Sequence, residues 1–280
     1  MWCETLTYDE VAQPAVIEML ARYRVDLLLA VRPWQLGDLG DAVRRVQGGG
    51  VFVGVWPMLA DADGRWASAS SCRAFLAFAD AVLVRAPFAD EVVIDLEPPH
   101  AQLDRLRRGR PTWLPRLGYG VARDAFAAAT RRWRDRHRVT TAVLPMLAIG
   151  NWVQRAIGTP ASALAVDRHS VMAYTTLFEG WSRGLVDRRR AERLLAACAR
   201  RSLRRFGARA AVSLGTVAPG AFGDEPSYRD VGELVRDVAV ARAAGIEELS
   251  LFDLGGVLRR PPAEAWFEAL CGATTPRCAP

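Results

Sequence analysis

Two acidic residues follow a run of β-branched residues in the stretch EVVIDLEPPH, which spans residues 91–100. Successive side chains of a strand point to opposite faces, so Asp95 and Glu97 would share one face with Val93. Carboxylates at the end of a buried strand are costly to desolvate, which makes function the best reason for keeping them. Paired carboxylates suit general acid–base chemistry, and we therefore expect the active site at this stretch.

The elements that would position this pair are a series of apolar runs, each typical of a strand buried on both faces. Segments with the pattern of helices separate these runs, for example residues 70–85, 120–136 and 186–206. Eight strands that alternate with helices predict a parallel α/β sheet, and at this length a single (β/α)8 barrel domain over residues 1–280. A doubly wound open sheet is the alternative. The predicted strands are 2–6, 25–33, 51–59, 91–97, 139–147, 170–178, 208–217 and 248–257.

Residues at the carboxyl ends of these strands would meet at one mouth, where such barrels place their active sites. Aromatic rings stack on the apolar faces of pyranoses, and carboxylates can act on a glycosidic oxygen. The collection therefore predicts a sugar-binding cleft beside Asp95 and Glu97. The expected substrate-binding residues are Glu4, Arg32, Trp34, Trp56, Met146, Phe252 and Asp253, with Tyr174 and Thr216 at the same mouth.

Several other chemistries lack the residues that they need. All 37 basic residues are arginine, which excludes a Schiff-base lysine, a pyridoxal-phosphate enzyme and a complete Walker A loop. The sequence has no G-x-S-x-G, no H-E-x-x-H and no G-x-G-x-x-G after the first strand. Its five cysteines form no C-x-x-C pair. We expect no cofactor.

Composition also bears on partners and location. The net charge is +6, and aromatic residues do not alternate with the arginine clusters at 105–110, 131–138 and 188–205 as a base-stacking surface would require. We therefore expect no nucleic-acid partner, and no apolar run is long enough for a membrane partner. The sequence as given shows no signal peptide, so we expect a cytoplasmic protein, or a secreted one if the true start lies upstream. The oligomeric state stays open.

The chain resembles the family 18 glycoside hydrolases, which are chitinase-like (β/α)8 enzymes. Their strand-four motif is D-x-x-D-x-D-x-E, and this sequence places Asp90, Val93, Asp95 and Glu97 at those four positions. Their strand-six motif, M-x-Y-D, corresponds to residues 172–175 here, with threonine in place of the acid. Phe252 and the Gly-rich turn after it resemble strand eight. Only the strand-four motif is specific, and a D-x-E there also occurs in family 25 lysozyme-like hydrolases.

This resemblance implies a retaining hydrolase of an oligo- or polysaccharide that could contain N-acetylhexosamine. Glu97 would be the acid and then the base, and Asp95 would assist the substrate's acetamido group, which acts as nucleophile. Tyr174 would hydrogen-bond that group, and Phe252 or Trp56 would lie under the sugar. Val93 and Thr175 stand where the family has acids, so the substrate could lack the acetamide.

Two other functions remain open from the sequence. A catalytically inactive barrel would keep the cleft and bind carbohydrate without cleaving it. A divalent-metal hydrolase or isomerase could use Asp95, Glu97 and His100 as ligands. We expect no metal, because His100 follows two prolines and would be a solvated loop residue, while His137 and His169 lie away from the mouth.

Overall fold

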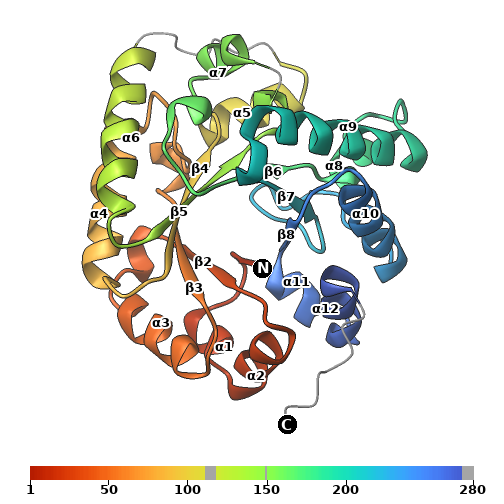
Figure 1. The fold of residues 1–280 in the computed structure, drawn as a ribbon, viewed down its shortest axis with the longest axis horizontal. Helices are drawn as coiled ribbons and strands as arrows, with labels where there is room; N and C mark the ends of the chain where they lie inside the picture. The colour runs from red at the N-terminus through yellow and green to blue at the C-terminus, as the bar shows by residue number, and fades with distance from the viewer. Residues whose placement is uncertain (111–117, 149, 273–280) are drawn as a thin grey trace.

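Eight parallel strands form one sheet in the order β1 to β8 (Figure 1). The structure is a computed structural model that describes residues 1–110, 118–148 and 150–272. Each strand pairs with the next one along the chain, and β1 also lies against β8. The sheet is therefore a nearly closed (β/α)8 barrel, and the predicted fold class is confirmed. The strands are β1 Trp2–Cys3, β2 Leu27–Val31, β3 Val53–Pro57, β4 Glu91–Leu96, β5 Arg138–Val143, β6 Arg168–Met172, β7 Ala210–Gly215 and β8 Glu248–Phe252.

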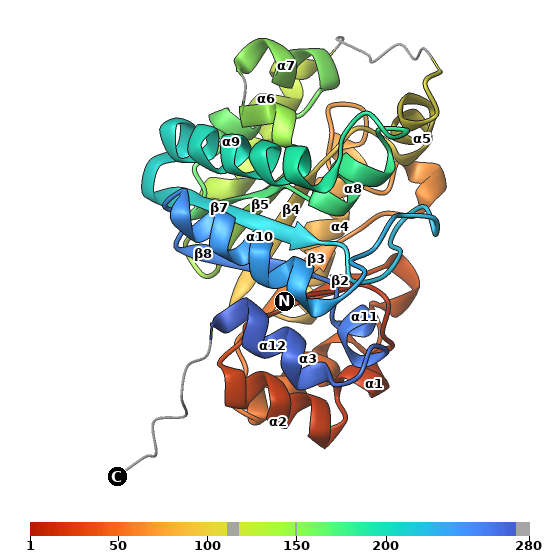
Figure 2. The same ribbon diagram turned by 90° about the vertical axis from the view of Figure 1, so that its right-hand side faces the viewer.

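Helices surround the barrel. Figure 2 shows α5, α7, α8 and α9 together on one side, whereas α1, α2 and α12 lie on the opposite side. The helices are α1 Tyr8–Val11, α2 Pro14–Tyr23, α3 Leu39–Gly48, α4 Cys72–Arg85, α5 His100–Arg107, α6 Tyr119–Trp133, α7 Asn151–Ile157, α8 Thr175–Gly180, α9 Arg188–Phe206, α10 Val231–Ala243, α11 Leu254–Leu258 and α12 Ala263–Cys271. A short 3-10 helix, η3 Pro145–Ala148, follows β5.

The strands bury both faces, as their apolar composition predicts. Outward side chains such as Ile94 and Leu96 pack in a large core against the helices. Inward side chains form a second, smaller core that includes Val93 and Ala142. Because side chains alternate along β4, Asp95 belongs to the inner face with Val93. The inner core consists of Trp2, Leu28, Ala30, Trp56, Met58, Val93, Ala142, Tyr174 and Phe252.

Every predicted strand is longer than the observed one, and the two predicted over 170–178 and 248–257 run into α-helices. β6 ends at Met172, and Thr175–Gly180 forms α8 instead of continuing the strand. β8 ends at Phe252, and Asp253 caps α11 by accepting a hydrogen bond from the backbone N–H of Gly256 (2.9 Å). Short apolar runs do not distinguish strand from helix by periodicity, which explains both errors. The Pro-, Arg- and Gly-rich segment 98–119 is predicted from its composition to be a long loop with a helical turn at 101–108. The turn is confirmed as α5, while residues 111–117 lie outside the described residues.

A buried carboxyl group, that of Glu91, lies at the end of the barrel opposite the predicted mouth. Glu91 begins β4, is fully buried, and its carboxyl oxygens make no hydrogen bond of normal geometry with the described residues, although Thr140 lies close enough to lower the pKa of Glu91. Arg138 Nη1 is 3.9 Å from it and lies on a partly exposed side chain. Burial raises the pKa of Glu91, although Arg168 opposes the shift.

We expect Glu91→Gln to raise the free energy of unfolding by about 1–3 kcal/mol at neutral pH, because an ionised carboxylate is no longer buried. When the pKa of a group is higher in the folded state than in the unfolded state, the group stabilises the fold at a pH below its unfolded-state pKa. This stabilisation is lost as the pH rises through the folded-state pKa. The gain should therefore vanish near pH 4 in urea unfolding curves. Glu248→Gln, which breaks the exposed 2.6 Å pair with Arg168, should change stability by less than about 1 kcal/mol. Equal effects of the two variants would contradict the prediction.

Candidate functional site

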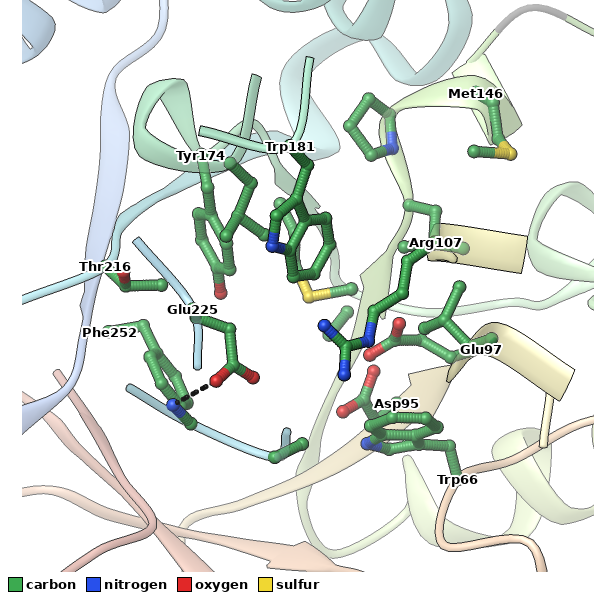
Figure 3. A pocket seen from close by; sticks show the side chains of 18 of the residues that line it. Trp66, Asp95, Glu97, Arg107, Met146, Tyr174, Trp181, Thr216, Glu225 and Phe252 are labelled. Carbon is green, nitrogen blue, oxygen red and sulfur yellow. Dashed lines mark hydrogen bonds between the residues drawn. The ribbon is translucent and has the colours of Figure 1, made fainter. Parts of the chain in front are cut away.

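Asp95 and Glu97 lie at the carboxyl end of β4 and are both buried. They line a cavity of about 770 Å³ at the mouth of the barrel (Figure 3). This volume is within the range of small-molecule sites, which is about 300–1,000 Å³. Among the residues expected at the mouth, the cavity brings together eight: Glu4, Trp56, Asp95, Glu97, Met146, Tyr174, Thr216 and Phe252.

The two carboxyl groups are neighbours, and each affects the pKa of the other. Burial raises the pKa of Glu97 well above its usual range, and the charge of Asp95 and a hydrogen bond with it add to the shift. Burial also raises the pKa of Asp95, as does the negative charge of Glu4, whereas Arg65 and the hydrogen bond from Glu97 lower it. The bond therefore stabilises protonated Glu97 as donor and ionised Asp95 as acceptor. Such an arrangement provides a general acid above the pH at which free carboxyls ionise.

A chain of ion pairs lies beside this pair. The buried Arg65 binds the Glu4 carboxylate and the Asp61 carboxylate, the latter at 2.8 Å. Arg32 binds the same Asp61 at 2.6 Å. Arg65 has a left-handed backbone (φ 60°), which is uncommon for a residue other than glycine. Arg65 reaches the cavity only through Glu4, because Glu4 lines the cavity and neither Arg65 nor Arg32 does.

Aromatic side chains form the inner wall of the cavity. The rings of Trp2 and Trp56 meet edge to face at 4.8 Å, and Trp56 meets Phe252 at 6.4 Å. Tyr174 lies 6.1 Å from Phe252, and its hydroxyl is 3.3 Å from Ser213 Oγ. Sequence reasoning missed Trp2, although its place in the first strand was a usable signal. Its indole N–H donates to Ser213 Oγ (2.8 Å) and to Ser250 Oγ (2.9 Å).

Two polar atoms in this wall make no hydrogen bond of normal length and angle with the described residues. They are Asp95 Oδ1 and the indole nitrogen of Trp56, although the Trp56 indole lies close enough to lower the pKa of Asp95. Both belong to side chains that line the cavity. Because buried polar groups are normally hydrogen-bonded, these atoms are candidates to bind a polar ligand.

A roof covers part of the cavity, and no sequence pattern predicts it. The segment after β7 brings Phe222 over the mouth, where its ring stacks on His100 at 4.8 Å and meets Trp181 at 6.1 Å. The Arg107 guanidinium lies 4.4 Å from the centre of the Phe222 ring. The roof residues come from three separate connections of the barrel, so only the fold brings them together.

Glu225 holds this segment in shape. Its carboxylate accepts hydrogen bonds from the backbone N–H of Gly220 (3.0 Å) and of Phe222 (2.8 Å), and it also lines the cavity (Figure 3). Arg107 adds a pair of 2.9 Å bonds to Asp224. The expectation that His100 is a solvated loop residue is wrong, because α5 begins at this residue and turns its ring onto Phe222.

Two more of the expected substrate-binding residues lie outside the cavity. Trp34 is 68% exposed and its ring packs on the Arg32 guanidinium at 4.9 Å. Asp253 is fully buried and accepts hydrogen bonds from Thr5 Oγ1 (2.7 Å) and from the first turn of α11. Neither side chain is part of the lining.

Thr175 also points away from the cavity. Its hydroxyl donates to the buried Asp237 and accepts a 2.9 Å bond from Arg188 Nη1. Tyr228 donates to the same carboxylate at 2.7 Å. Burial raises the pKa of Asp237 to about 6. An acid at position 175 would meet Asp237, so the threonine fits the surroundings that this chain provides.

Metal ligands do not gather in the described ranges: no three His, Cys, Asp or Glu side chains there are placed to hold a metal ion. His137 Nδ1 lies 2.7 Å from the carbonyl oxygen of Ala89, and His169 Nδ1 lies 2.7 Å from Thr141 Oγ1. Neither histidine lines the cavity. In the same part of the chain, every helix is too short or too polar to cross a bilayer.

Comparison with known proteins shows the fold. No protein-family model and no curated sequence matches the chain. A class V chitinase from Nicotiana tobaccum has a TM-score of 0.55 at 12% identity, with 95% of each chain covered. The PgaB glycoside hydrolase domain from Bordetella bronchiseptica has a TM-score of 0.54 at 13% identity, covering 92% of this chain and 93% of that one.

A third similar structure is a glycoside hydrolase family 5 enzyme from Prevotella bryantii in complex with a xyloglucan tetradecasaccharide. Its TM-score is 0.54 at 11% identity, and 96% of this chain and 86% of that chain are covered. The three structures belong to different groups of enzymes, so the likeness does not fix a family. The chain shares the (β/α)8 barrel fold of these structures and has a buried carboxyl pair at the end of its fourth strand.

Proposed function

We propose that this protein is a retaining glycoside hydrolase with Glu97 as its acid and base and Asp95 as its assisting carboxylate. The observation that carries the proposal is the buried pair of neighbouring carboxyl groups at the end of β4, which lines the cavity at the mouth of the barrel. Its surroundings support the same role, since Trp2, Trp56 and Phe252 provide rings that could contact a pyranose.

Glu97 would donate its proton to the glycosidic oxygen as the bond to the anomeric carbon breaks. The lost hydrogen bond would leave Asp95 ionised and able to stabilise positive charge in the sugar, or to orient an acetamido group of the substrate. Glu97, now ionised, would then take a proton from the attacking water. Tyr174, which lies between β6 and α8 and lines the cavity, would donate a hydrogen bond to the substrate.

The closeness of the two carboxyls favours retention over inversion. Inverting enzymes hold a water between carboxyl groups about 6.5–9.5 Å apart. A pair joined by a hydrogen bond leaves no room for that water. The nucleophile would then come from the substrate itself, as in the substrate-assisted families.

A second candidate function is carbohydrate binding without cleavage. It is favoured by the position of Thr175, which turns to Asp237 and brings no further carboxylate to the cavity. The same cavity would bind sugar, and the carboxyl pair would act only as a hydrogen-bonding group.

The test is a screen of the purified protein against 4-nitrophenyl β-glycosides of N-acetylglucosamine, glucose, galactose and xylose, together with chito-, cello- and xylo-oligosaccharides. Nitrophenol release and chromatography would detect cleavage, and calorimetry would detect binding. We expect cleavage of at least one substrate. Binding of an oligosaccharide without any cleavage would establish the second function, and neither cleavage nor binding would contradict both.

A further inference from the structure

The cavity continues outward from the carboxyl pair over a wall made of aliphatic side chains. This wall comes from α5, η3, α7 and α9, outside the barrel strands. In Figure 3 Met146 of η3 and Phe252 of β8 lie on opposite sides of the view, so the lining spans well beyond the aromatic inner wall. The aliphatic members are Leu103, Leu106, Pro145, Met146, Ile157 and Leu194.

Three of these side chains are exposed to solvent at the rim. Leu106 is 41% exposed, Met146 43% and Leu194 41%, and they belong to three different elements. Apolar side chains that converge from separate elements on one opening are typical of a ligand-binding groove. Water contact with them is unfavourable, and an apolar ligand would relieve it.

This wall is poorly suited to a further sugar ring. Sugar hydroxyls need hydrogen-bond partners when they leave water. The charged side chains from these elements that line the described cavity are Arg107 and Arg201. Arg107 is already bound to Asp104 and Asp224. A hydrocarbon chain needs no such partners and gains free energy from each methylene that it buries.

We propose that the aliphatic wall binds an unbranched alkyl aglycone, so that the substrate is an alkyl glycoside. This inference rests on the proposed hydrolase function and names its substrate class. Because the wall belongs to the same cavity as Glu97, a chain on the glycosidic oxygen can extend directly onto it. Glu97 protonates that oxygen, the bond to the anomeric carbon breaks, and the chain leaves as an alcohol. Water supplies the hydroxyl of the released sugar and returns the proton to Glu97.

The test uses methyl, butyl, hexyl and octyl β-glycosides of N-acetylglucosamine and, in parallel, of glucose, at concentrations below micelle formation. We expect kcat/KM to rise by up to about fourfold for each added methylene, and by at least about tenfold from methyl to hexyl. Leu194→Gln and Met146→Gln should lower the ratio of kcat/KM for octyl to that for methyl. Leu185→Gln is the matched control, since Leu185 is 75% exposed and does not line the cavity.

Calorimetry of the same glycosides with Glu97→Gln separates the two proposals. Cleavage with equal kcat/KM for all chain lengths would overturn the alkyl inference while the hydrolase function stands. The opposite outcome would be that longer chains bind more tightly, that Leu194→Gln weakens this binding, and that the wild type cleaves none of the glycosides. That outcome would support the alkyl site and contradict the hydrolase function. Chain length without effect on either binding or cleavage would overturn the inference.

Discussion

Replacing Glu97 with glutamine is expected to lower kcat for glycoside hydrolysis by about 10²–10⁴-fold, the range of general acid–base catalysis. An amide keeps the size and the hydrogen-bond donor of protonated Glu97 but cannot give a proton to the leaving oxygen. Sugar binding, measured by calorimetry, should therefore change much less than kcat. Steady-state kinetics on the substrate found by the screen would measure the loss.

The leaving group and the pH dependence make this prediction specific. An aryl glycoside with an acidic phenol needs little proton donation, so its cleavage should suffer less from Glu97→Gln than that of an alkyl glycoside. Burial and the charge of Asp95 raise the pKa of Glu97, so wild-type activity should persist above the usual carboxyl range and fall as pH rises through the pKa of the pair. A variant that loses less than tenfold, or that keeps this alkaline limb, would contradict the role of Glu97.

The sequence predicts the barrel because burial on both faces leaves a clear mark on each strand. The run 51–59 is almost wholly apolar, as expected for a strand that packs against helices on one face and a filled barrel interior on the other. Alternation then gives the direction of side chains, so the inward placement of Asp95 follows from Val93 and Ile94. The active-site position follows in turn from the strand end.

The direction of side chains just beyond the strand ends is harder to predict, because the strand alternation no longer applies once the strand has ended. Phe252 ends β8 and lines the cavity, whereas Asp253 turns to cap α11. Tyr174 lines the cavity, whereas Thr175 begins α8 and binds Asp237. In each case a helix begins directly after the strand, and its backbone conformation turns the side chain away from the cavity.

The roof could not be predicted for a different reason. Trp66 also contacts the roof, since its ring meets that of Phe222 at 6.2 Å. Trp66, His100, Trp181 and Phe222 follow one another at intervals of 34 to 81 residues, and each looks like an ordinary loop or helix-end aromatic. Their contacts depend on the paths of four connections over the mouth. Loop paths are set by side-chain contacts such as those of Glu225 with backbone N–H groups, which no periodic pattern records.

Replacing Arg65 with methionine is expected to lower the free energy of unfolding by about 3–5 kcal/mol, the loss that follows removal of one partner of a buried ion pair. The change removes the cation that pairs with Glu4, whereas Asp61 keeps its ion pair with Arg32. Burial already raises the pKa of Glu4, and Arg65 opposes that shift. Without Arg65 the pKa rises further, so Glu4 gives stability below its unfolded pKa that is lost as pH rises. Urea unfolding should show a larger loss at pH 8 than at pH 4.

Two control variants separate the buried pair from general effects of losing an arginine. Arg44→Met breaks the exposed 3.1 Å pair with Asp41, and it should cost less than about 1 kcal/mol. In the double variant Glu4→Gln with Arg65→Met, no unpaired charge remains, so part of the lost stability should return. A double variant less stable than Arg65→Met, or an Arg65→Met loss no larger than that of Arg44→Met, would contradict the buried ion pair.

The same substitution should change catalysis, because the Arg65 charge lowers the pKa of both Asp95 and Glu97. Removing it favours the protonated pair, so the alkaline limb of the pH profile of kcat should move to higher pH in Arg65→Met. Arg44→Met should leave that limb in place. A purely structural role of Arg65 would reduce the amount of folded enzyme without moving the limb. The pH profile of kcat, corrected for the folded fraction, therefore distinguishes an electrostatic role of Arg65 from support of the fold.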